Sequence, residues 1–333
     1  MAAPALVPPE QDLVDLIRAG RSHELDLRGA FLVRADLRGL DLSSLDLSGA
    51  DLSCADLEGA NLMLTNLEGA CLFEARLDGA ELTAACLRGA DLRHASAHRA
   101  GFGRAQLDKA SLGEGDFREA SFVQASLQDA AAAGACFQRA RLNEAGLAGV
   151  DLSRADLREA ELEDVDWSGA CLRRADLRHA SLRGARGYTT ADWIGADARE
   201  ADFNGAYLLR RELIDQNYLD EFRRQSRGSA VVFHVWQLTS NCGRSVTRWA
   251  LWTAFIAVFF AAIYSSLPIA YSYDSPLAPL YFSVVTLTTL GYGDALPTTT
   301  LGQAVVMCQV VVGYIMLGGL LSIFSGKMAT RGE

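Results

Sequence analysis

Positive charge is missing from a long stretch near the end of this 333-residue chain. Residues 249–326 contain no Lys or Arg, and only Asp274 and Asp294 carry charge there. Soluble domains devote about a quarter of their residues to charged side chains, so this segment indicates a membrane-embedded part. Residues 26–209 instead hold 30 acidic and 20 basic residues, which account for the whole net charge of −10 and indicate a water-soluble part.

Signatures of enzyme and metal chemistry are also missing. The seven cysteines are an odd number without the spacing of metal ligands or of a disulfide framework, so we expect reduced thiols in a cytosolic compartment. The sequence has no nucleophile elbow, Walker loop, CxxC or HExxH motif. We therefore expect no catalytic residue and no cofactor, and the protein is not predicted to be an enzyme.

Internal repetition dominates the water-soluble part. Every fifth residue from Leu27 to Leu182 gives 32 positions, of which 29 are Leu or Phe and the exceptions are Ala97, Ala132 and Trp167. The residue two positions earlier is Ala in 25 of 31 cases. A period of five makes no stripe on a helix, and on a continuous strand it alternates between faces. Both objections vanish if the chain turns a corner every five residues, with the Leu and Ala side chains pointing inward.

These repeats resemble the pentapeptide-repeat family, whose fold is a right-handed, quadrilateral β-helix with four units per coil. The resemblance implies a β-solenoid over residues 26–209, with about nine coils and a length of about 44 Å at the ~4.8 Å strand spacing. The repeat slips by one residue near 187–190 and resumes at Trp193. Glycines recur every ten residues from Gly29 to Gly89, which predicts that alternate corners need glycine-permissive turns.

The solenoid needs covered ends. Within residues 1–25, the segment 9–19 predicts an amphipathic capping helix, and residues 207–227 predict a second helix at the other end. Some pentapeptide-repeat proteins mimic DNA, but ten net charges over ~44 Å are far sparser than one per ~1.7 Å of duplex. We therefore expect a rigid cytosolic scaffold or interaction module with an unidentified protein or ligand as partner, and no nucleic acid.

Two apolar stretches, residues 249–267 and 301–324, are long enough to cross a bilayer. A shorter apolar stretch, residues 277–290, lies between them and predicts a re-entrant segment. Basic residues lie just before the first span and just after the second, whereas the loop between the spans has none. Both termini are therefore predicted to be cytoplasmic.

The re-entrant segment ends in Thr286-Leu287-Thr288-Thr289-Leu290-Gly291-Tyr292-Gly293-Asp294. Placed after a short apolar helix between two spans, this motif resembles the filter signature of the two-transmembrane potassium-channel pore family, and the likeness covers residues 248–326. The resemblance implies that the carbonyls of four successive residues, with a threonine hydroxyl, replace the hydration shell of a permeant K⁺ ion. The ion-binding residues would be Thr289, Leu290, Gly291, Tyr292 and Gly293. The family's usual Val is Leu290 here, at a position where the carbonyl is used.

Three other residues take roles from the same resemblance. Thr286, near the C-terminus of the pore helix, and Asp294, at the extracellular mouth, would support the filter. Gly313 lies 22 residues after Gly291, where the family's inner helix often has a gating hinge; close helix packing explains this glycine equally well. One chain supplies one filter strand, so a homotetramer in a lipid bilayer is implied.

The sequence thus predicts four segments: a capping helix (1–25), a pentapeptide-repeat β-helix (26–209), a helical cap, linker and interfacial segment (210–247), and a two-span pore domain (248–328). The predicted function is a potassium-selective channel with the repeat domain as scaffold or regulator. The alternative is a membrane-tethered interaction scaffold with a non-conducting pore. The preference for Arg over Lys indicates a bacterial inner membrane.

Overall fold

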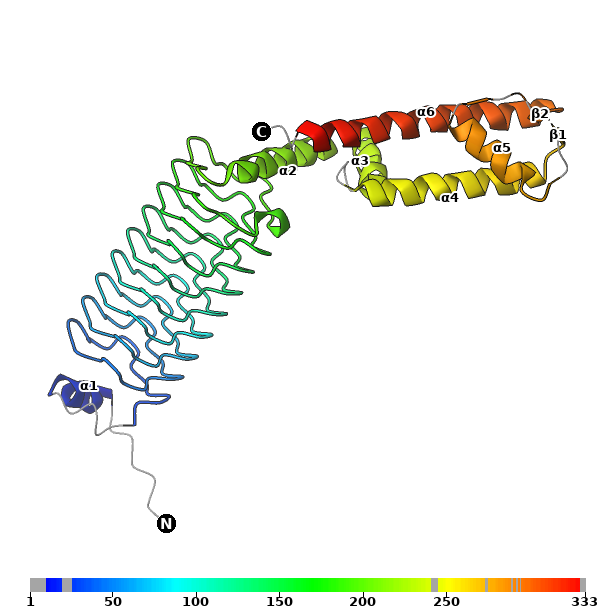
Figure 1. The fold of residues 1–333 in the computed structure, drawn as a ribbon. Coiled ribbons are helices and arrows are strands. Elements are labelled where there is room, and N and C mark those ends of the chain that lie inside the picture. The colour runs from blue at the N-terminus through cyan, green and yellow to red at the C-terminus, as the bar shows by residue number, and fades with distance from the viewer. Residues whose placement is uncertain are drawn as a thin grey trace, which may run out of the picture. The chain divides into compact units, whose positions relative to one another are not determined.

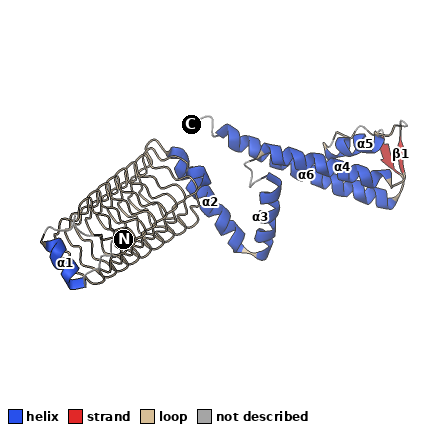
Figure 2. Ribbon diagram, turned by 90° about the horizontal axis from the view of Figure 1, so that it is seen from below, coloured by secondary structure: helices blue, strands red, loops and turns tan. Residues whose placement is uncertain are grey.

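The computed structural model describes residues 10–19, 26–240, 245–272, 275–288, 290, 291, 293 and 295–329. They belong to two compact units, Met1–Asp220 and Glu221–Glu333. The first unit consists of stacked coils with helix α1 (Glu10–Arg18) at one end and helix α2 (Tyr207–Gln225) at the other (Figures 1 and 2). The second unit is built mainly from helices.

The coils of the first unit have four sides of five residues each. Each side forms a parallel bridge with the side that follows 20 residues later, as Phe31 does with Asp51. At that bridge the N–H of Leu32 donates to the carbonyl of Asp51 at 2.7 Å, and the N–H of Asp51 donates to the carbonyl of Ala30 at 2.9 Å. The predicted β-solenoid of pentapeptide repeats is confirmed.

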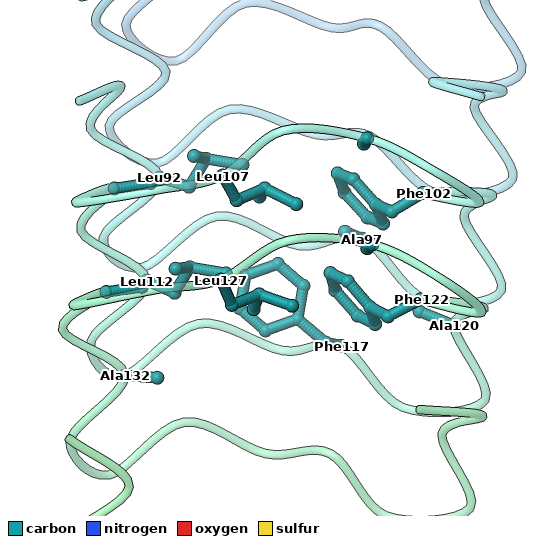
Figure 3. Close-up of a cluster of buried hydrophobic side chains, with 14 of the residues drawn as sticks. Leu92, Ala97, Phe102, Leu107, Leu112, Phe117, Ala120, Phe122, Leu127 and Ala132 are labelled. Atoms are coloured by element: carbon teal, nitrogen blue, oxygen red, sulfur yellow. The ribbon is translucent and has the colours of Figure 1, made fainter. Parts of the chain in front are cut away.

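The fifth-position side chains fill the interior of the coils, and each of them from Leu27 to Leu182 is at most 2% exposed. Figure 3 shows Phe102 and Phe122 on successive coils, and their rings stack with centroids 4.6 Å apart. Two of the exceptions to the Leu/Phe rule, Ala97 and Ala132, lie on the coils on either side of the one that holds both Phe117 and Phe122. The small residues therefore make room next to the coil with two rings, which keeps the core close-packed.

The third exception, Trp167, belongs to the one-residue slip. Its ring lies 5.4 Å from that of Trp193, and both side chains are buried. The position 20 residues after Trp167 is Gly187, which offers no side chain where a core leucine would otherwise stand. The extra residue enters through the 3₁₀ turn Tyr188–Thr190, and the carbonyl of Tyr188 accepts the indole N–H of Trp193 at 3.0 Å. The predicted slip is confirmed, because the bridge spacing changes here from 20 to 21 residues.

The corners of the coil all use a left-handed residue. Arg34, Gly39 and Ser44, at three successive corners, have φ of 57°, 60° and 59°. The expectation that only alternate corners need a glycine-permissive turn is therefore wrong, because non-glycine residues adopt the same conformation. Each of them gives up roughly 1 kcal/mol relative to a right-handed conformation. The corner persists because it places the next side in register with the coils above and below.

A side chain satisfies the corner backbone. The carboxylate of Asp41 accepts the N–H of Ser43 at 3.1 Å, and the amide oxygen of Asn61 accepts the N–H of Met63 at 3.2 Å. This short-range bond explains why Asp and Asn so often precede the core leucine. Where Asp precedes the leucine and Arg follows it, the guanidinium also binds that carboxylate. For example, Nε of Arg38 donates to Oδ1 of Asp36 at 2.9 Å.

Helix α1 covers the first coil. Its Leu13 and Ile17 are buried in the same hydrophobic core as Leu27. The guanidinium of Arg18 donates to the carbonyl of Asp36 at 3.1 Å, so a helix side chain satisfies a backbone acceptor of the solenoid. The sequence-predicted helix began at residue 9, which lies outside the described residues.

Helix α2 covers the last coil with buried Leu209 and with two amide side chains. Gln216 accepts the N–H of Trp193 at 2.8 Å and donates to the carbonyl of Ala191 at 3.0 Å. Asn217 accepts the N–H of Gly195 at 2.6 Å and donates to the carbonyl of Ala196 at 3.3 Å. Each amide uses its oxygen as an acceptor and an N–H as a donor toward the coil, as a backbone peptide would, so the two side chains take the place of a further coil at these four backbone groups.

The second unit begins with the end of α2 and helix α3 (Arg227–Ser240), followed by α4 (Val246–Ser265). The short strands β1 (Ile269–Tyr271) and β2 (Ala295–Pro297) pair antiparallel. Between them lies α5 (Ala278–Leu287), which packs against both α4 and the long helix α6 (Thr300–Ala329) (Figure 1). The predicted helical domain with a short helix between two long ones is confirmed.

Replacing Gln216 and Asn217 by Ala should loosen the last coil, because four backbone groups lose their partners, at about 1 kcal/mol each. We expect amide hydrogen exchange at residues 191–196 to accelerate at least about tenfold. Gln225→Ala, at the exposed end of the same helix, is the matched control and should leave exchange unchanged. Equal protection in the double variant and the control would show that the amides do not cap the solenoid.

The repeat domain should lose stability in acid. Hydrogen bonds from the Arg28 and Arg38 guanidinium groups hold the pKa of Asp26 and of Asp36 at about 2, against the usual 3.8. A lowered folded-state pKa gives stability that is complete above pH ~4 and is lost as the pH falls toward 2. The thermal midpoint of the chain in detergent should therefore drop over that range. The double variant Asp26→Asn, Asp36→Asn keeps one acceptor oxygen at each position and cannot titrate there, so a drop as steep as that of the unmodified chain would contradict this origin.

Candidate functional site

Two helices of the second unit are long and apolar enough to cross a membrane. They are Val246–Ser265, which is α4, and Thr300–Leu321 within α6. Helix α5 is equally apolar but has only ten residues, about 15 Å, which is half the thickness of a hydrocarbon core. The site is therefore built from two spans and one helix that is too short to cross.

The chain enters and leaves α5 on the same side. The β1–β2 pair places Tyr271, before α5, opposite Ala295, after it. The ring of Phe282 on α5 lies 4.9 Å from that of Tyr264 on α4 and 6.2 Å from that of Tyr271. These ring contacts pack α5 against α4 and β1. The strand pairing brings the chain after α5 back to the level at which it entered, so the filter motif lies between the end of α5 and β2.

The filter motif follows the end of α5 directly. The N–H of Leu290 donates to the carbonyl of Val285 at 3.1 Å, which ties the first described residue of the predicted ion-binding set back to the helix. Gly291 and Gly293 have φ of 46° and 75°, in the left-handed region that residues with a Cβ seldom adopt. A Cβ on either glycine would meet no atom of the same chain, so backbone conformation alone favours glycine here. The sequence-predicted site residues Thr289, Tyr292 and Asp294 lie outside the described residues.

The remaining two predicted site residues are helical. Thr286 is the penultimate residue of α5 and is 7% exposed. Gly313 lies in α6 against the end of α5, where a Cβ would clash with the carbonyl oxygen of Leu287. Close helix packing is therefore one role of Gly313 in this conformation, and it brings α6 against Leu287, the last residue of α5.

A buried polar network joins the three helices, and sequence reasoning missed it. The hydroxyl of Tyr264 on α4 donates to Oε1 of Gln309 on α6 at 2.5 Å. The Gln309 amide nitrogen donates to Oγ of Ser283 on α5 at 2.7 Å and to the Ser283 carbonyl at 3.0 Å. The Ser283 hydroxyl donates to the carbonyl of Ala257 on α4 at 2.7 Å. The signal in the sequence was a glutamine inside an apolar span, which membrane helices keep only with a partner.

A second contact joins the far ends of the two spans. The indole N–H of Trp249 on α4 donates to the carbonyl of Met316 on α6 at 3.1 Å. Gly319 on α6 lies beneath the indole, where a Cβ would clash with the ring. Together with the polar network, this contact sets the separation of α4 and α6 at two heights.

Much of the apolar surface of the spans is uncovered within one chain. Phe255 and Val258 on α4, and Val311 and Ile315 on α6, are each more than half exposed. Leu290 in the filter motif is 59% exposed as well. Soluble proteins rarely expose so large an apolar area, so lipid or further copies of the chain must cover it.

The described residues offer no cluster of metal-ligating side chains. No group of three or more His, Cys, Asp or Glu side chains that could hold a metal ion occurs among them. The described residues of α4, α5 and β2 after Arg248 carry no charged side chain at all. The described polar side chains on α5 and on the part of α6 packed against it are hydroxyls and one amide.

Comparison with protein families divides the chain as the structure does. The ion channel family model matches residues 251–330. The pentapeptide-repeat model matches in eight copies, over residues 23–53, 41–79, 75–113, 105–144, 135–171 and 151–186. No curated protein matches the chain.

Solved structures similar to the chain are repeat proteins. HetL, a pentapeptide repeat protein involved in heterocyst differentiation regulation in the cyanobacterium Nostoc, is 28% identical; the match covers 59% of this chain and 92% of HetL, with a TM-score of 0.28. QnrB1, a plasmid-mediated fluoroquinolone resistance protein, is 22% identical over 56% of this chain and 95% of its own, with a TM-score of 0.37. A pentapeptide repeat protein from the Arabidopsis thaliana thylakoid lumen is 30% identical over 37% of this chain and 72% of its own, with a TM-score of 0.25.

The two family matches fall on the two kinds of structure. Pentapeptide repeats coincide with the four-sided coils, and the ion channel match begins within α4 and ends just beyond α6. The chain therefore unites an N-terminal domain of the pentapeptide-repeat family with a C-terminal domain of the ion channel family.

Proposed function

We propose that the protein is a potassium-selective channel in which four copies of the chain each contribute one filter strand. The observation that carries the proposal is the Leu-Gly-Tyr-Gly-Asp segment on the returning arm after α5, with Gly291 and Gly293 both left-handed. Left-handed glycines at alternate positions allow successive carbonyls to face one side, where they replace the water around an ion. Potassium passes as the permeant ion, and no cofactor takes part.

Four copies are required because one chain offers only one strand of oxygens. Leu290 is 59% exposed within the chain, which leaves this residue accessible to other copies around a shared axis. Cyclic symmetry closes such a ring with identical contacts between neighbours, and the uncovered apolar faces of α4 and α6 supply the contact surfaces.

The channel lies in a bacterial inner membrane with both termini in the cytoplasm. Arg248 stands in the first turn of α4, whereas the chain from there to Gly326 has no Lys or Arg. Positive charge is retained on the cytoplasmic side, so the repeat domain is cytosolic and the filter motif is near the outer surface.

The repeat domain regulates the pore through a continuous path. Gln216 and Asn217 fix α2 to the last coil. Near the other end of α2 the Arg223 guanidinium lies 5.8 Å from the Phe233 ring of α3. The indole N–H of Trp252 on α4 donates to the carbonyl of Leu238 on α3 at 3.2 Å. In this proposal a cytosolic protein or ligand on the repeat domain acts through α2, which leads from the last coil into the second unit, and then through the contacts among α2, α3 and α4.

Potassium flux from liposomes reconstituted with the purified chain tests the conduction. Gly291→Ala should lower flux at least about tenfold, because an alanine in the left-handed region costs about 1 kcal/mol in each of four strands. Gly318→Ala is the matched control, since a Cβ there meets no atom and φ is ordinary. Equal flux in both variants would exclude this filter. No flux from the unmodified chain, with or without residues 1–209, would favour the membrane-tethered scaffold.

Removal of residues 1–209 tests the regulation. Single-channel open probability should change at least about threefold, and a rise or a fall tells whether the repeat domain holds the pore shut or open. The variant with Ala at positions 216 and 217 should shift open probability in the same direction, because it uncouples α2 from the coil. Gln225→Ala should not. An unchanged open probability in the truncated chain would make the repeat domain a scaffold without influence on the pore.

A further inference from the structure

We propose that Gln309 is a positioning residue that sets the ion selectivity of the pore by holding α5 against α6. The inference rests on the proposed function and extends it to a residue outside the filter motif. The polar network is defined as Tyr264, Ser283 and Gln309 with the Ala257 carbonyl. Through it α6 controls where α5 lies, and α5 controls where the filter strand begins.

The network is complete, which makes its geometry exacting. Tyr264, Ser283 and Gln309 are 1%, 0% and 0% exposed. The Gln309 amide uses its oxygen and both N–H groups within the network, and the Ser283 hydroxyl both accepts and donates. Rotation or sliding of α6 by even part of a turn would leave several buried polar groups unpaired in a region without water.

The contacts between α6 and α5 share one spacing. Gln309 meets Ser283, and four residues later Gly313 meets Leu287, also four residues after Ser283. One face of α6 therefore follows one face of α5 over a full helical turn. The second contact is with the last residue of α5, and the N–H of Leu290 is bonded back to Val285. A shift of α6 at Gln309 passes to the filter strand over fewer than ten residues.

Gln309 acts through α5 and not on the ion. All three polar positions of its amide are already committed, and the side chain has no exposed surface. A filter discriminates K⁺ from Na⁺ through the arrangement of the carbonyl oxygens that coordinate the ion. Loosening the base of the strand should therefore relax selectivity while leaving a conducting pore.

The test uses the full chain in liposomes with four variants. Tyr264→Phe removes one hydrogen bond and no volume, Gln309→Leu removes all three amide bonds, and the double variant combines them. Gln303→Leu is the matched control, because it makes the same substitution at an exposed position of the same helix. Two quantities are measured: the ratio of K⁺ to Na⁺ flux, and hydrogen exchange of residues 283–290.

The expected loss of selectivity is about threefold for Tyr264→Phe and about tenfold for Gln309→Leu, in line with interhelical hydrogen bonds in membranes. The double variant should lose no more than Gln309→Leu alone, because among the described residues the tyrosine hydroxyl bonds only to that amide. Exchange of residues 283–290 should accelerate in the same order, and Gln303→Leu should stay within about twofold of the unmodified chain.

A purely structural role would lower the amount or thermal stability of the channel without moving the flux ratio. Folded Gln309→Leu channels with an unchanged K⁺ to Na⁺ ratio would therefore overturn the proposal. If Gln309→Leu does not fold, the isosteric Tyr264→Phe decides it in the same way. If the unmodified chain conducts no potassium, the proposed function fails, whereas hydrogen exchange still reports whether Gln309 positions α5.

Discussion

The repeat domain depends on a turn that the chain makes after every fifth residue. The turn requires a left-handed residue, and at more than twenty corners that residue is not glycine. Its local cost is met because it alone brings each leucine N–H opposite a carbonyl of the neighbouring coil, 2.6–2.8 Å away along most of the domain. The leucine core, the outward carboxylates and the surface ion pairs all follow from that register. If the same sequence formed a continuous strand or helix, its leucines would not all lie on one buried face.

In the membrane unit, by contrast, a few polar side chains and close contacts set the positions of the helices. Within helices the backbone is paired internally, so helix position depends on packing and on side chains that bond across. Gln309 and Trp249 are such side chains, one at the level of α5 and one toward the other end of the spans. Glycines stand where backbone or an indole comes close, at positions 313 and 319. The short helix is therefore fixed by contacts that are few, specific and placed on both spans.

Sequence reasoning succeeded where a pattern has a local cause. The five-residue period fixed the core from Leu27 to Leu182, and the one-residue slip located the 3₁₀ turn at Tyr188–Thr190. It failed where neighbours distant in sequence decide the outcome. The glycine spacing predicts two kinds of corner, whereas Arg34 and Gly39 have φ of 57° and 60°. The partners of Gln309 are 26 and 45 residues away, and only the relative rotation of three helices brings them together.

The amide side chains that close the solenoid have a consequence for assembly. A coil left bare would present a row of N–H and C=O groups on a surface nearly identical to every other coil, and so would accept another solenoid end to end. Copies confined to a membrane meet far more often than copies in solution, which makes such fibre growth a hazard for a membrane-anchored repeat protein in particular. Gln216 and Asn217 bond to backbone groups of the last coil, which are then no longer free to pair with another solenoid. These two residues therefore set the length of a stack that could otherwise grow by end-to-end association.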